Sequence, residues 1–353
     1  MKHAANKPVL ITGGSGFIGS YLALALLKRG QRVVLFDRDP DTRRLTGFGQ
    51  AYTDYQKEGM VTFVQGDLSL LPHVMALFDK HEPQSVFHLG ALLSAGTESN
   101  PTMGFQVDLV GTWNVLEAAR LYCQQRQGMA PIRVLFPSTI ASFGRFLPTP
   151  GNVANESVQM PTTMYGCAKV ASERLGEYYH AKKWVDFRAV RFPSVVGAAR
   201  GPGGTTVYST LMMQQPLLGK VYDVYVKPER QLDILYVKDA VNALTSLHDA
   251  AKLPDDKRRV YNIAGIRTQG QAPSTQQIAD AVMANGVAAD RITFNAFDAG
   301  LDTTVQGFGI LSDQAAKDDW HWAGAKYDLS ATIVDFAKEL KAAPGRLKAL
   351  ELF

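Results

Sequence analysis

The sequence has few of the residues on which whole classes of site depend. Its two cysteines, Cys123 and Cys167, offer neither a disulfide framework nor the spacing of metal ligands. We therefore expect no metal site. So few thiols also suit a reducing compartment, so we expect a cytoplasmic protein.

Long apolar runs and concentrated charge are also missing. No stretch approaches the roughly 18 apolar residues that a transmembrane helix needs, and the apolar run near the start is too short for a signal peptide. The net charge of +4 is scattered in short runs such as Arg43-Arg44 and Lys257-Arg258-Arg259. Because no basic stripe with interleaved aromatic residues stands out, we expect neither a nucleic-acid partner nor a membrane partner.

The first half of the chain alternates short β-branched runs with helical patterns. The expected strands lie at 8–12, 32–36, 61–67, 85–90, 132–138 and 185–194, and the expected helices at 16–29, 104–126 and 163–182. Strands that alternate with helices predict an α/β fold with a Rossmann-type, doubly wound parallel sheet.

After about residue 195 the pattern changes. Loops are expected at 145–161 and 199–206, helices at 207–219, 274–285 and 328–342, strands at 221–226 and 260–265, and a strand followed by a helix at 232–244. We predict that residues 1–195 form a nucleotide-binding domain to which segments of about 232–265 return. Residues 196–231 and 266–353 would then form mainly a smaller C-terminal substrate-binding lobe.

A glycine-rich turn joins the first strand to the first helix. In LITGGSGFIGS (10–20), Gly13 permits a tight turn, Gly16 lets the backbone approach a pyrophosphate, and Gly19 allows close packing of the helix. The pyrophosphate would sit at the positive end of that helix. This pattern predicts a dinucleotide cofactor.

The end of the second strand bears on which dinucleotide is bound. Asp37 lies 18 residues beyond Gly19, where its carboxylate can accept both ribose hydroxyls of the adenosine and repel a 2′-phosphate. We therefore expect NAD, although Arg38 beside it could bind that phosphate. Asp67, after the third strand, either accepts from the adenine amino group or closes a simple turn.

Tyr165 and Lys169 lie four residues apart at the start of an expected helix, so both side chains share one face. The pKa of a free phenol is about 10, too high for a base at neutral pH. A neighbouring ammonium and the positive nicotinamide would lower it toward 7, and the lysine could also hold the nicotinamide ribose. Upstream, Ser138 or Thr139 in FPSTIASFG offers a hydroxyl that could polarise a substrate oxygen.

Three motifs in this order, TGGSGFIG, STIASFG and YGCAK, resemble those of the extended short-chain dehydrogenases/reductases. That group includes nucleotide-sugar epimerases, dehydratases and reductases. Within it, the stretches HLGALLSAGTESNP, TTMYGCAKVASERLGEYYH and GPGGTTVY are most similar to epimerase-like L-threonine 3-dehydrogenases. The resemblance implies bound NAD, a small-molecule substrate and a homodimer formed by the helices at about 104–126 and 163–182.

The resemblance also implies roles for single residues. Tyr165 would be the general base, Lys169 would lower its pKa and bind ribose, and Thr139, with Ser138 beside it, would polarise the substrate oxygen. The candidate substrate-binding residues are Ser94, Thr139, Tyr165, Thr205 and Thr206. The candidate cofactor-binding residues are Gly13, Gly16, Phe17, Ile18, Gly19, Asp37, Arg38, Asp67, Leu68, Leu89, Gly90, Ala91, Tyr165, Lys169, Phe192 and Pro193.

The chain departs from the pattern of these enzymes at three positions. Asp108 stands where the family usually has an asparagine that organises a proton-relay water. Val207 stands where the threonine enzymes, as we align them, carry an aspartate suited to the substrate ammonium. Leu232 stands where nucleotide-sugar epimerases often place an arginine. Three cations are left as candidates for holding an anion: Arg200, Lys227 and Arg230.

The sequence thus favours an NAD-dependent oxidoreductase acting on a secondary alcohol of a small polar substrate, L-threonine or a related hydroxy acid. One alternative is a nucleotide-sugar epimerase or dehydratase, in which the hydride leaves and returns. Another is a non-enzymatic sensor of cofactor redox state, although such proteins often lose the Tyr–Lys pair that is intact here.

Overall fold

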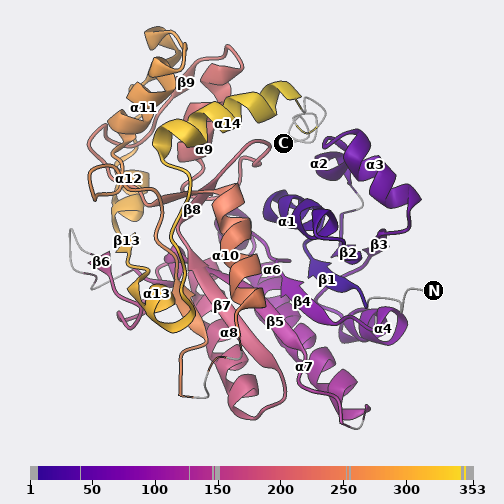
Figure 1. Ribbon diagram of the computed structural model, residues 1–353. Coiled ribbons are helices and arrows are strands. Elements are labelled where there is room, and N and C mark those ends of the chain that lie inside the picture. Colours follow the sequence, from indigo (N-terminus) through magenta and orange to yellow (C-terminus); the bar gives the residue numbers. More distant parts are fainter. Residues whose placement is uncertain are drawn as a thin grey trace.

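A seven-stranded parallel sheet forms the centre of the protein (Figure 1). The computed structural model describes residues 7–39, 41–126, 128–144, 147, 152–251, 253, 256–342 and 346. Across the sheet the strands are β11 (Val260–Asn262), β7 (Asp186–Phe192), β5 (Arg133–Thr139), β4 (Ser85–His88), β1 (Val9–Thr12), β2 (Val33–Asp37) and β3 (Val61–Gln65). Every neighbouring pair is parallel, so the predicted Rossmann-type α/β fold is confirmed.

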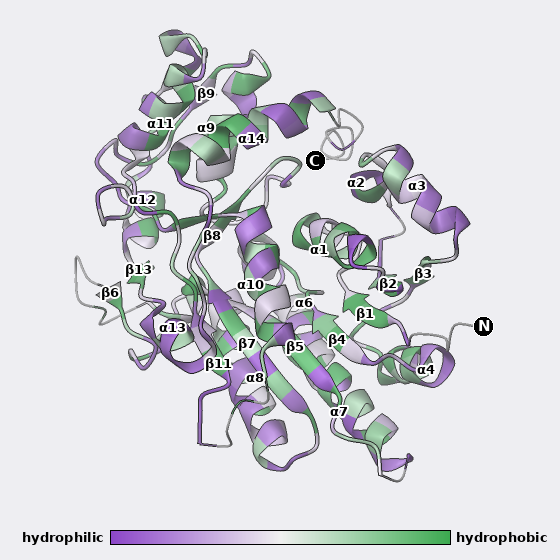
Figure 2. Cartoon of the chain, viewed as in Figure 1, coloured by the Kyte–Doolittle hydropathy of each residue, from purple (hydrophilic) through white to green (hydrophobic). Residues whose placement is uncertain are grey.

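Helices cover both faces of this sheet. One face packs against α1 (Phe17–Lys28) and α10 (Val237–Asp249), and the other against α4 (Leu71–His81), α7 (Gly111–Gln124) and α8 (Met164–Ala181). Alternate residues of one strand pack against the two helix layers. Val9 and Ile11 lie in the hydrophobic cluster of α1 and α10, while Leu10 between them lies in the cluster of α4, α7 and α8. A strand buried on both faces reads as a continuous apolar run, as β1 does, and β1 is green in Figure 2, whereas β7 is banded with purple.

The remaining helices are short or belong to the second lobe, which lies at the carboxyl edge of the sheet. The short elements are α2 (Arg43–Thr46), α3 (Gln50–Lys57), α5 (Ser94–Ser99), α6 (Pro101–Gly104), the π-helix η1 (Phe105–Val110) and the 3₁₀ turns η2 (Ile140–Ser142) and η3 (Ala289–Arg291). The lobe helices are α9 (Tyr208–Leu217), α11 (Thr275–Ala284), α12 (Ala299–Gln306), α13 (Gln314–Trp320) and α14 (Leu329–Ala342). None of the helices in the described part of the chain is long and apolar enough to cross a bilayer.

Three pairs of short strands tie the lobe together. They are β8 (Ser194–Val196) with β10 (Ile234–Tyr236), β9 (Tyr222–Asp223) with β12 (Ile292–Thr293), and β6 (Asn152–Val153) with β13 (Ile310–Leu311). The pairing of β8 with β10 brings the segment after residue 232 back beside the main sheet. The predicted domain boundaries stay a prediction, since the secondary structure alone does not test them.

Several expected elements differ in detail. The single helix expected at 104–126 is interrupted by η1, and the strand expected at 221–226 shrinks to β9, because only two of its residues find partners on β12. The loop expected at 145–161 contains β6, while residues 145–146 and 148–151 lie outside the described part. The helices α4, α12 and α13 were not expected from the sequence pattern.

The order of the strands reverses between β1 and β4, so the loops after these strands run apart and leave a crevice at the carboxyl edge. Gly13 and Gly90 meet at this point. Gly13 has a φ of +67°, and a Cβ on it would lie 2.7 Å from the backbone nitrogen of Gly90. Only glycine permits both the left-handed turn and the close approach.

A buried ion pair fixes α8 against β5 and β7 beneath this crevice. Arg191 donates from Nη2 to Glu173 Oε2 at 2.8 Å and from Nε to Oε1 at 3.0 Å. Ser138 and Gln159 donate to the same carboxylate, at 2.5 and 2.9 Å. The Glu173 side chain is fully buried, so its charge depends on these partners.

We predict that Glu173→Ala destabilises the protein by about 3–5 kcal/mol, because it leaves the Arg191 guanidinium buried without a carboxylate. Equilibrium unfolding in urea measures the loss. Glu177→Ala on the same helix is the control, since Glu177 pairs with Arg174 nearer the surface and should cost less than about 1 kcal/mol. Equal losses in the two variants would contradict the prediction.

Candidate active site

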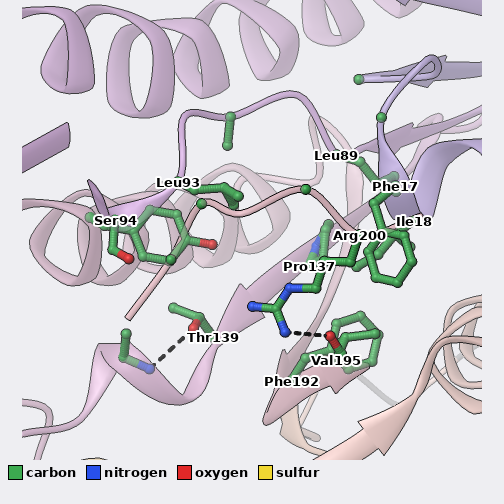
Figure 3. A pocket seen from close by; sticks show the side chains of 18 of the residues that line it. Phe17, Ile18, Leu89, Leu93, Ser94, Pro137, Thr139, Phe192, Val195 and Arg200 are labelled. Atoms are coloured by element: carbon green, nitrogen blue, oxygen red, sulfur yellow. Dashed lines mark hydrogen bonds between the residues drawn. The ribbon is translucent and has the colours of Figure 1, made fainter. Parts of the chain in front are cut away.

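One cavity of about 770 Å³ occupies the crevice and extends under the second lobe (Figure 3). It is lined by the turn after β1, the end of β2, the loop after β4, the end of β5, the start of α8 and residues 192–206. Thirteen of the expected cofactor-binding residues line it: Gly13, Gly16, Phe17, Ile18, Gly19, Asp37, Leu89, Gly90, Ala91, Tyr165, Lys169, Phe192 and Pro193. The candidates Ser94, Ser138, Thr139, Thr205 and Thr206 line the same cavity.

The other three expected cofactor residues are not among the lining residues. Arg38 is exposed, and its Nη1 lies 3.9 Å from Met103 Sδ. Asp67 accepts from the backbone nitrogen and the hydroxyl of Ser69, both at 2.8 Å, which makes it a turn aspartate. Leu68 is buried and packs beneath Gly90.

The end of the cavity nearest β2 has the features that an adenosine diphosphate group requires. Gly16 precedes the first turn of α1, and Gly19 lies so close to the carbonyl of Gly13 that a Cβ would not fit. Asp37 Oδ2 accepts from the backbone nitrogen of Ser15 at 3.2 Å, which holds the carboxylate beside the glycine turn. These residues fit a dinucleotide, with its pyrophosphate at the N-terminus of α1.

Arg44 also lines this end, and no sequence motif pointed to it. It lies on α2, and its Nε donates to the carbonyl of Ala199 at 3.3 Å. Burial lowers the pKa of its guanidinium, and the carboxylates of Asp41, Asp39 and Asp37 oppose this shift. Ala199 has a φ of +65°, a left-handed conformation that is costly for a residue with a Cβ.

Helix α8 presents Tyr165 and Lys169 one turn apart. Its N-cap, Thr163, accepts from the backbone nitrogen of Gly166 at 3.0 Å. Lys169 Nζ lies 5.5 Å from the centroid of the Tyr165 ring and 4.3 Å from that of Phe136, and it donates to the carbonyl of Pro137 at 3.0 Å. Burial lowers the pKa of Lys169 to about 8, and the charges of Asp108 and Glu173 oppose this shift.

Burial raises the pKa of the Tyr165 phenol, and the carboxylate of Asp108 raises it further. The charge of Arg200 and the hydroxyl of Thr139 act in the opposite direction but do not outweigh burial. The expectation that Lys169 and the positive nicotinamide together lower this pKa stays a prediction for the complex with NAD.

The two adjacent hydroxyls of β5 serve different partners. Thr139 Oγ1 accepts from the backbone nitrogen of Ala141 at 3.1 Å, shown as a dashed line in Figure 3, and its hydroxyl lies close enough to Tyr165 to lower the pKa of the phenol. Ser138 Oγ instead donates to Glu173 at 2.5 Å. Successive side chains of a strand point to opposite sides, so the structure places Thr139, and not the hydroxyl of Ser138, beside Tyr165.

Asp108 lies in the π-helix, buried close enough to Lys169 and Tyr165 for their charges to interact. Its Oδ1 accepts from the backbone nitrogen of Leu92 at 2.7 Å. Its Oδ2 has no hydrogen-bond partner among the described residues. Burial raises the pKa of Asp108 to about 6, although the ammonium of Lys169 lowers it.

His88 links this helix to the cofactor loop. Its Nδ1 lies 2.7 Å from Thr12 Oγ1, and its Nε2 lies 3.0 Å from Thr112 Oγ1. Thr112 donates to the carbonyl of Asp108, so it accepts from His88 Nε2–H. Thr12 accepts from the backbone nitrogen of Gly90 and therefore donates to Nδ1. Burial lowers the pKa of His88 to about 3, so the ring is neutral and structural.

The comparison with known families agrees with this geometry. Residues 9–264 match the family described as the NAD dependent epimerase/dehydratase family. The chain belongs to this family. Members of the family are NAD-dependent dehydrogenases and epimerases of the extended short-chain type, so the protein is an enzyme of this type and its cofactor is NAD.

Three of the proteins that are similar to this chain are described as L-threonine dehydrogenases. The mitochondrial L-threonine 3-dehydrogenase of Bos taurus is 29% identical over 327 residues, which cover 90% of this chain and 79% of that protein. The structure of a GalE-like L-threonine dehydrogenase from Cupriavidus necator in the holo form is 30% identical and covers 94% of this chain and 99% of its own, with a TM-score of 0.78. The structure of a monomeric L-threonine 3-dehydrogenase from a metagenome, in the apo form, is 25% identical. The match covers 94% of this chain and 98% of that one, with a TM-score of 0.79.

We predict that Asp108→Asn changes how stability depends on pH. The folded-state pKa of Asp108, about 6, lies above the ordinary value of 3.8 for an aspartate, so the carboxyl destabilises the wild type increasingly as pH rises through this range. The stability of the variant relative to wild type should therefore rise by about 1–2 kcal/mol between pH 5 and pH 8. Urea unfolding at both pH values measures this rise, and a pH-independent difference would contradict it.

Proposed function

We propose that the enzyme oxidises the secondary alcohol of a small polar substrate, L-threonine or a related hydroxy acid, and releases NADH. The observation that carries the proposal is the position of Tyr165. Its phenol lies beside the Thr139 hydroxyl, in the cavity that the glycine turn and Asp37 share with Ser94, Thr205 and Thr206. NAD, when bound, supplies the hydride acceptor.

The side chains of the chain would divide the remaining work. Tyr165 takes the proton from the substrate hydroxyl, and Thr139 hydrogen-bonds the same oxygen. Lys169 donates to the nicotinamide ribose and favours the phenolate by its charge, once its ammonium turns from the Pro137 carbonyl. Asp37 accepts the adenosine ribose hydroxyls.

The substrate pocket is preorganised by hydrogen bonds between its own hydroxyls. Thr205 donates from its backbone nitrogen to Ser94 Oγ at 3.3 Å, and the two side-chain oxygens lie 3.4 Å apart. Ser194 Oγ donates to Thr206 Oγ1 at 2.7 Å, and Tyr225 donates to the carbonyl of Thr205 at 2.8 Å. Such a pocket suits a short substrate with several polar groups.

A nucleotide-sugar epimerase is the second candidate for the site. Leu232 is buried and apolar, and Asp233 beside it is held by Arg267 at 2.6 Å, so this segment offers no free cation to a sugar diphosphate. The two reactions differ in their products. A dehydrogenase accumulates NADH with its substrate, whereas an epimerase returns the hydride and accumulates none.

We predict that Tyr165→Phe lowers turnover by about 10²–10⁴-fold, because the phenyl ring keeps the packing and loses the proton acceptor. NADH formation with a panel of hydroxy acids, amino acids and sugars measures turnover. NAD titration by fluorescence should show that the variant still binds the cofactor.

Two neighbouring substitutions serve as the matched pair for this experiment. Thr139→Ala should lower turnover more than Ser138→Ala, because the Thr139 hydroxyl lies beside Tyr165 while Ser138 donates to Glu173. A Tyr165→Phe enzyme within threefold of wild type would remove the assignment of the base. Equal losses at 138 and 139 would show that the substrate oxygen lies elsewhere.

The expected homodimer and the cytoplasmic location stay predictions. A groove on η1, α7 and α8 supports the dimer, and its lining residues are Leu109, Val110, Trp113, Ala171, Arg174 and Leu175. Trp113, one of these residues, is 39% exposed, which is unusual for so large an apolar side chain. One of the similar solved structures is described as monomeric, so the family alone does not decide the oligomeric state.

If two copies pair through this groove, Trp113→Glu should yield monomers, because the contact would bury the new charge without a partner. Light scattering after size-exclusion chromatography measures the mass. Val334→Glu, at an exposed apolar position on α14, is the control and should leave the mass unchanged. A wild-type monomer would contradict the prediction.

A further inference from the structure

Arg200 brings a positive charge to the substrate end of the cavity without a carboxylate to balance it. Its Nη1 donates only to neutral oxygens: the carbonyl of Val195 at 2.7 Å, Ser194 Oγ at 3.2 Å and Thr210 Oγ1 at 3.3 Å. Figure 3 shows its side chain reaching into the cavity, with the bond to Val195 dashed. Within the described chain, no ion pair involves Arg200, and Nη2 and Nε have no hydrogen-bond acceptor.

The guanidinium remains charged where it lies. Burial lowers the pKa of Arg200 to about 10, and the phenols of Tyr225 and Tyr165 oppose this shift. Its Nη2 is 3.5 Å from the point where a Cβ on Gly204 would lie, so the free edge of the fork faces the loop that bounds the substrate end. An unpaired cation in a partly desolvated cavity favours an anionic ligand.

No carboxylate among the described lining residues lies at the same end of the cavity to balance a cationic group. The acidic residues among its described lining residues are Asp37 and Asp39, and both lie at the adenosine end. Around Arg200 the lining consists of hydroxyls, glycines and apolar side chains. Val207, which follows the two threonines, is apolar and packed in the core. An ammonium here would lose its hydration, meet no carboxylate and be repelled by Arg200.

The other two candidate cations are occupied or distant. Arg230 donates to both carboxylate oxygens of Asp302, and neither it nor Lys227 lines the cavity. Lys227 is exposed, with its ammonium 5.9 Å from the centroid of the Phe297 ring. Arg200 is therefore the arginine that can meet a substrate anion.

We propose that the substrate is a small hydroxy carboxylate without an amino group, whose carboxylate is bound by Arg200. This inference rests on the proposed function and narrows it from L-threonine or a related hydroxy acid to the hydroxy acid. The planar fork of Arg200 matches the two oxygens of a carboxylate, and one guanidinium balances one negative charge. A phosphate monoester, with nearly two charges, is the less favoured anion.

The reaction balances with NAD as the oxidant. The C–H bond of the carbinol breaks and its electron pair leaves with the hydrogen to NAD. The O–H proton passes to Tyr165, and the oxygen becomes a carbonyl. The products are an oxo acid, NADH and one proton, while the carboxylate bound by Arg200 keeps its charge throughout.

Four matched alcohols test this assignment in the wild-type enzyme with NAD. 3-Hydroxybutyrate carries only the carboxylate, L-threonine carries both charged groups, 1-amino-2-propanol carries only the ammonium, and 2-butanol carries neither. NADH formation should show the highest kcat/KM for 3-hydroxybutyrate, at least about tenfold above L-threonine, a ratio equivalent to about 1.4 kcal/mol.

Arg200→Gln should raise KM for 3-hydroxybutyrate by about 30-fold or more, which corresponds to the roughly 2 kcal/mol lost when one partner of a charged hydrogen bond is removed. Activity with 2-butanol should change less than threefold, which separates loss of the anion contact from general damage to the pocket. Arg200→Lys should recover part of the affinity. Lys227→Gln, which removes a charge from the same lobe outside the cavity, is the matched control and should behave as wild type.

Binding gives a second readout that does not depend on turnover. Calorimetric titration of the NAD-loaded enzyme should detect 3-oxobutyrate, which cannot react with the oxidised cofactor, and Arg200→Gln should weaken its binding by a similar factor. Inorganic phosphate, titrated in parallel, should bind more weakly than 3-oxobutyrate.

The outcomes separate the two levels of the proposal. If L-threonine is oxidised at least as well as 3-hydroxybutyrate, if 3-oxobutyrate does not bind, or if Arg200→Gln leaves its binding unchanged, the assignment of the substrate class is overturned. Tighter, Arg200-dependent binding of phosphate would overturn the carboxylate in favour of a phosphate ester. If no alcohol is oxidised while 3-oxobutyrate binding still depends on Arg200, the dehydrogenase proposal fails and the anion site stands.

Discussion

The parallel direction of the central strands is the constraint on which the whole site depends. Because β1, β2, β4, β5 and β7 all run the same way, their carboxyl ends meet at one edge of the sheet. The glycine turn, Asp37, the loop from Leu89 and Thr139 are far apart in the sequence, yet they line one cavity. The buried pair of Glu173 and Arg191 then fixes α8, and with it Tyr165, against that edge.

The features that could be predicted from the sequence are those that depend on local spacing. The glycine turn needs particular backbone angles, and Tyr165 and Lys169 share a face whenever a helix forms. The alternation of apolar runs likewise predicted the parallel sheet. Each of these patterns is formed by residues that are close together in the sequence, so it can be recognised without knowing the fold.

The features that could not be predicted depend on packing between distant segments. Adjacent hydroxyls at 138 and 139 look equivalent in the sequence, and only the structure shows that the Ser138 hydroxyl is taken up by the buried Glu173 carboxylate. Arg200 and Arg230 are equivalent candidates for an anion site in the sequence, and only the structure shows that Arg230 is paired with Asp302. The burial that raises the pKa of Tyr165 likewise depends on packing between distant segments, which the spacing of Tyr165 and Lys169 does not reveal.

The hydrogen bond from Arg44 to the carbonyl of Ala199 spans the two ends of the cavity. Ala199 directly precedes Arg200 and holds a left-handed backbone angle, so the orientation of the guanidinium depends on a peptide that the adenosine end fastens. The consequence is mechanical: helix α2 supports the segment that carries Arg200. A substitution that removes Arg44 from α2 would therefore alter the support of the backbone that carries Arg200, from the adenosine end of the cavity.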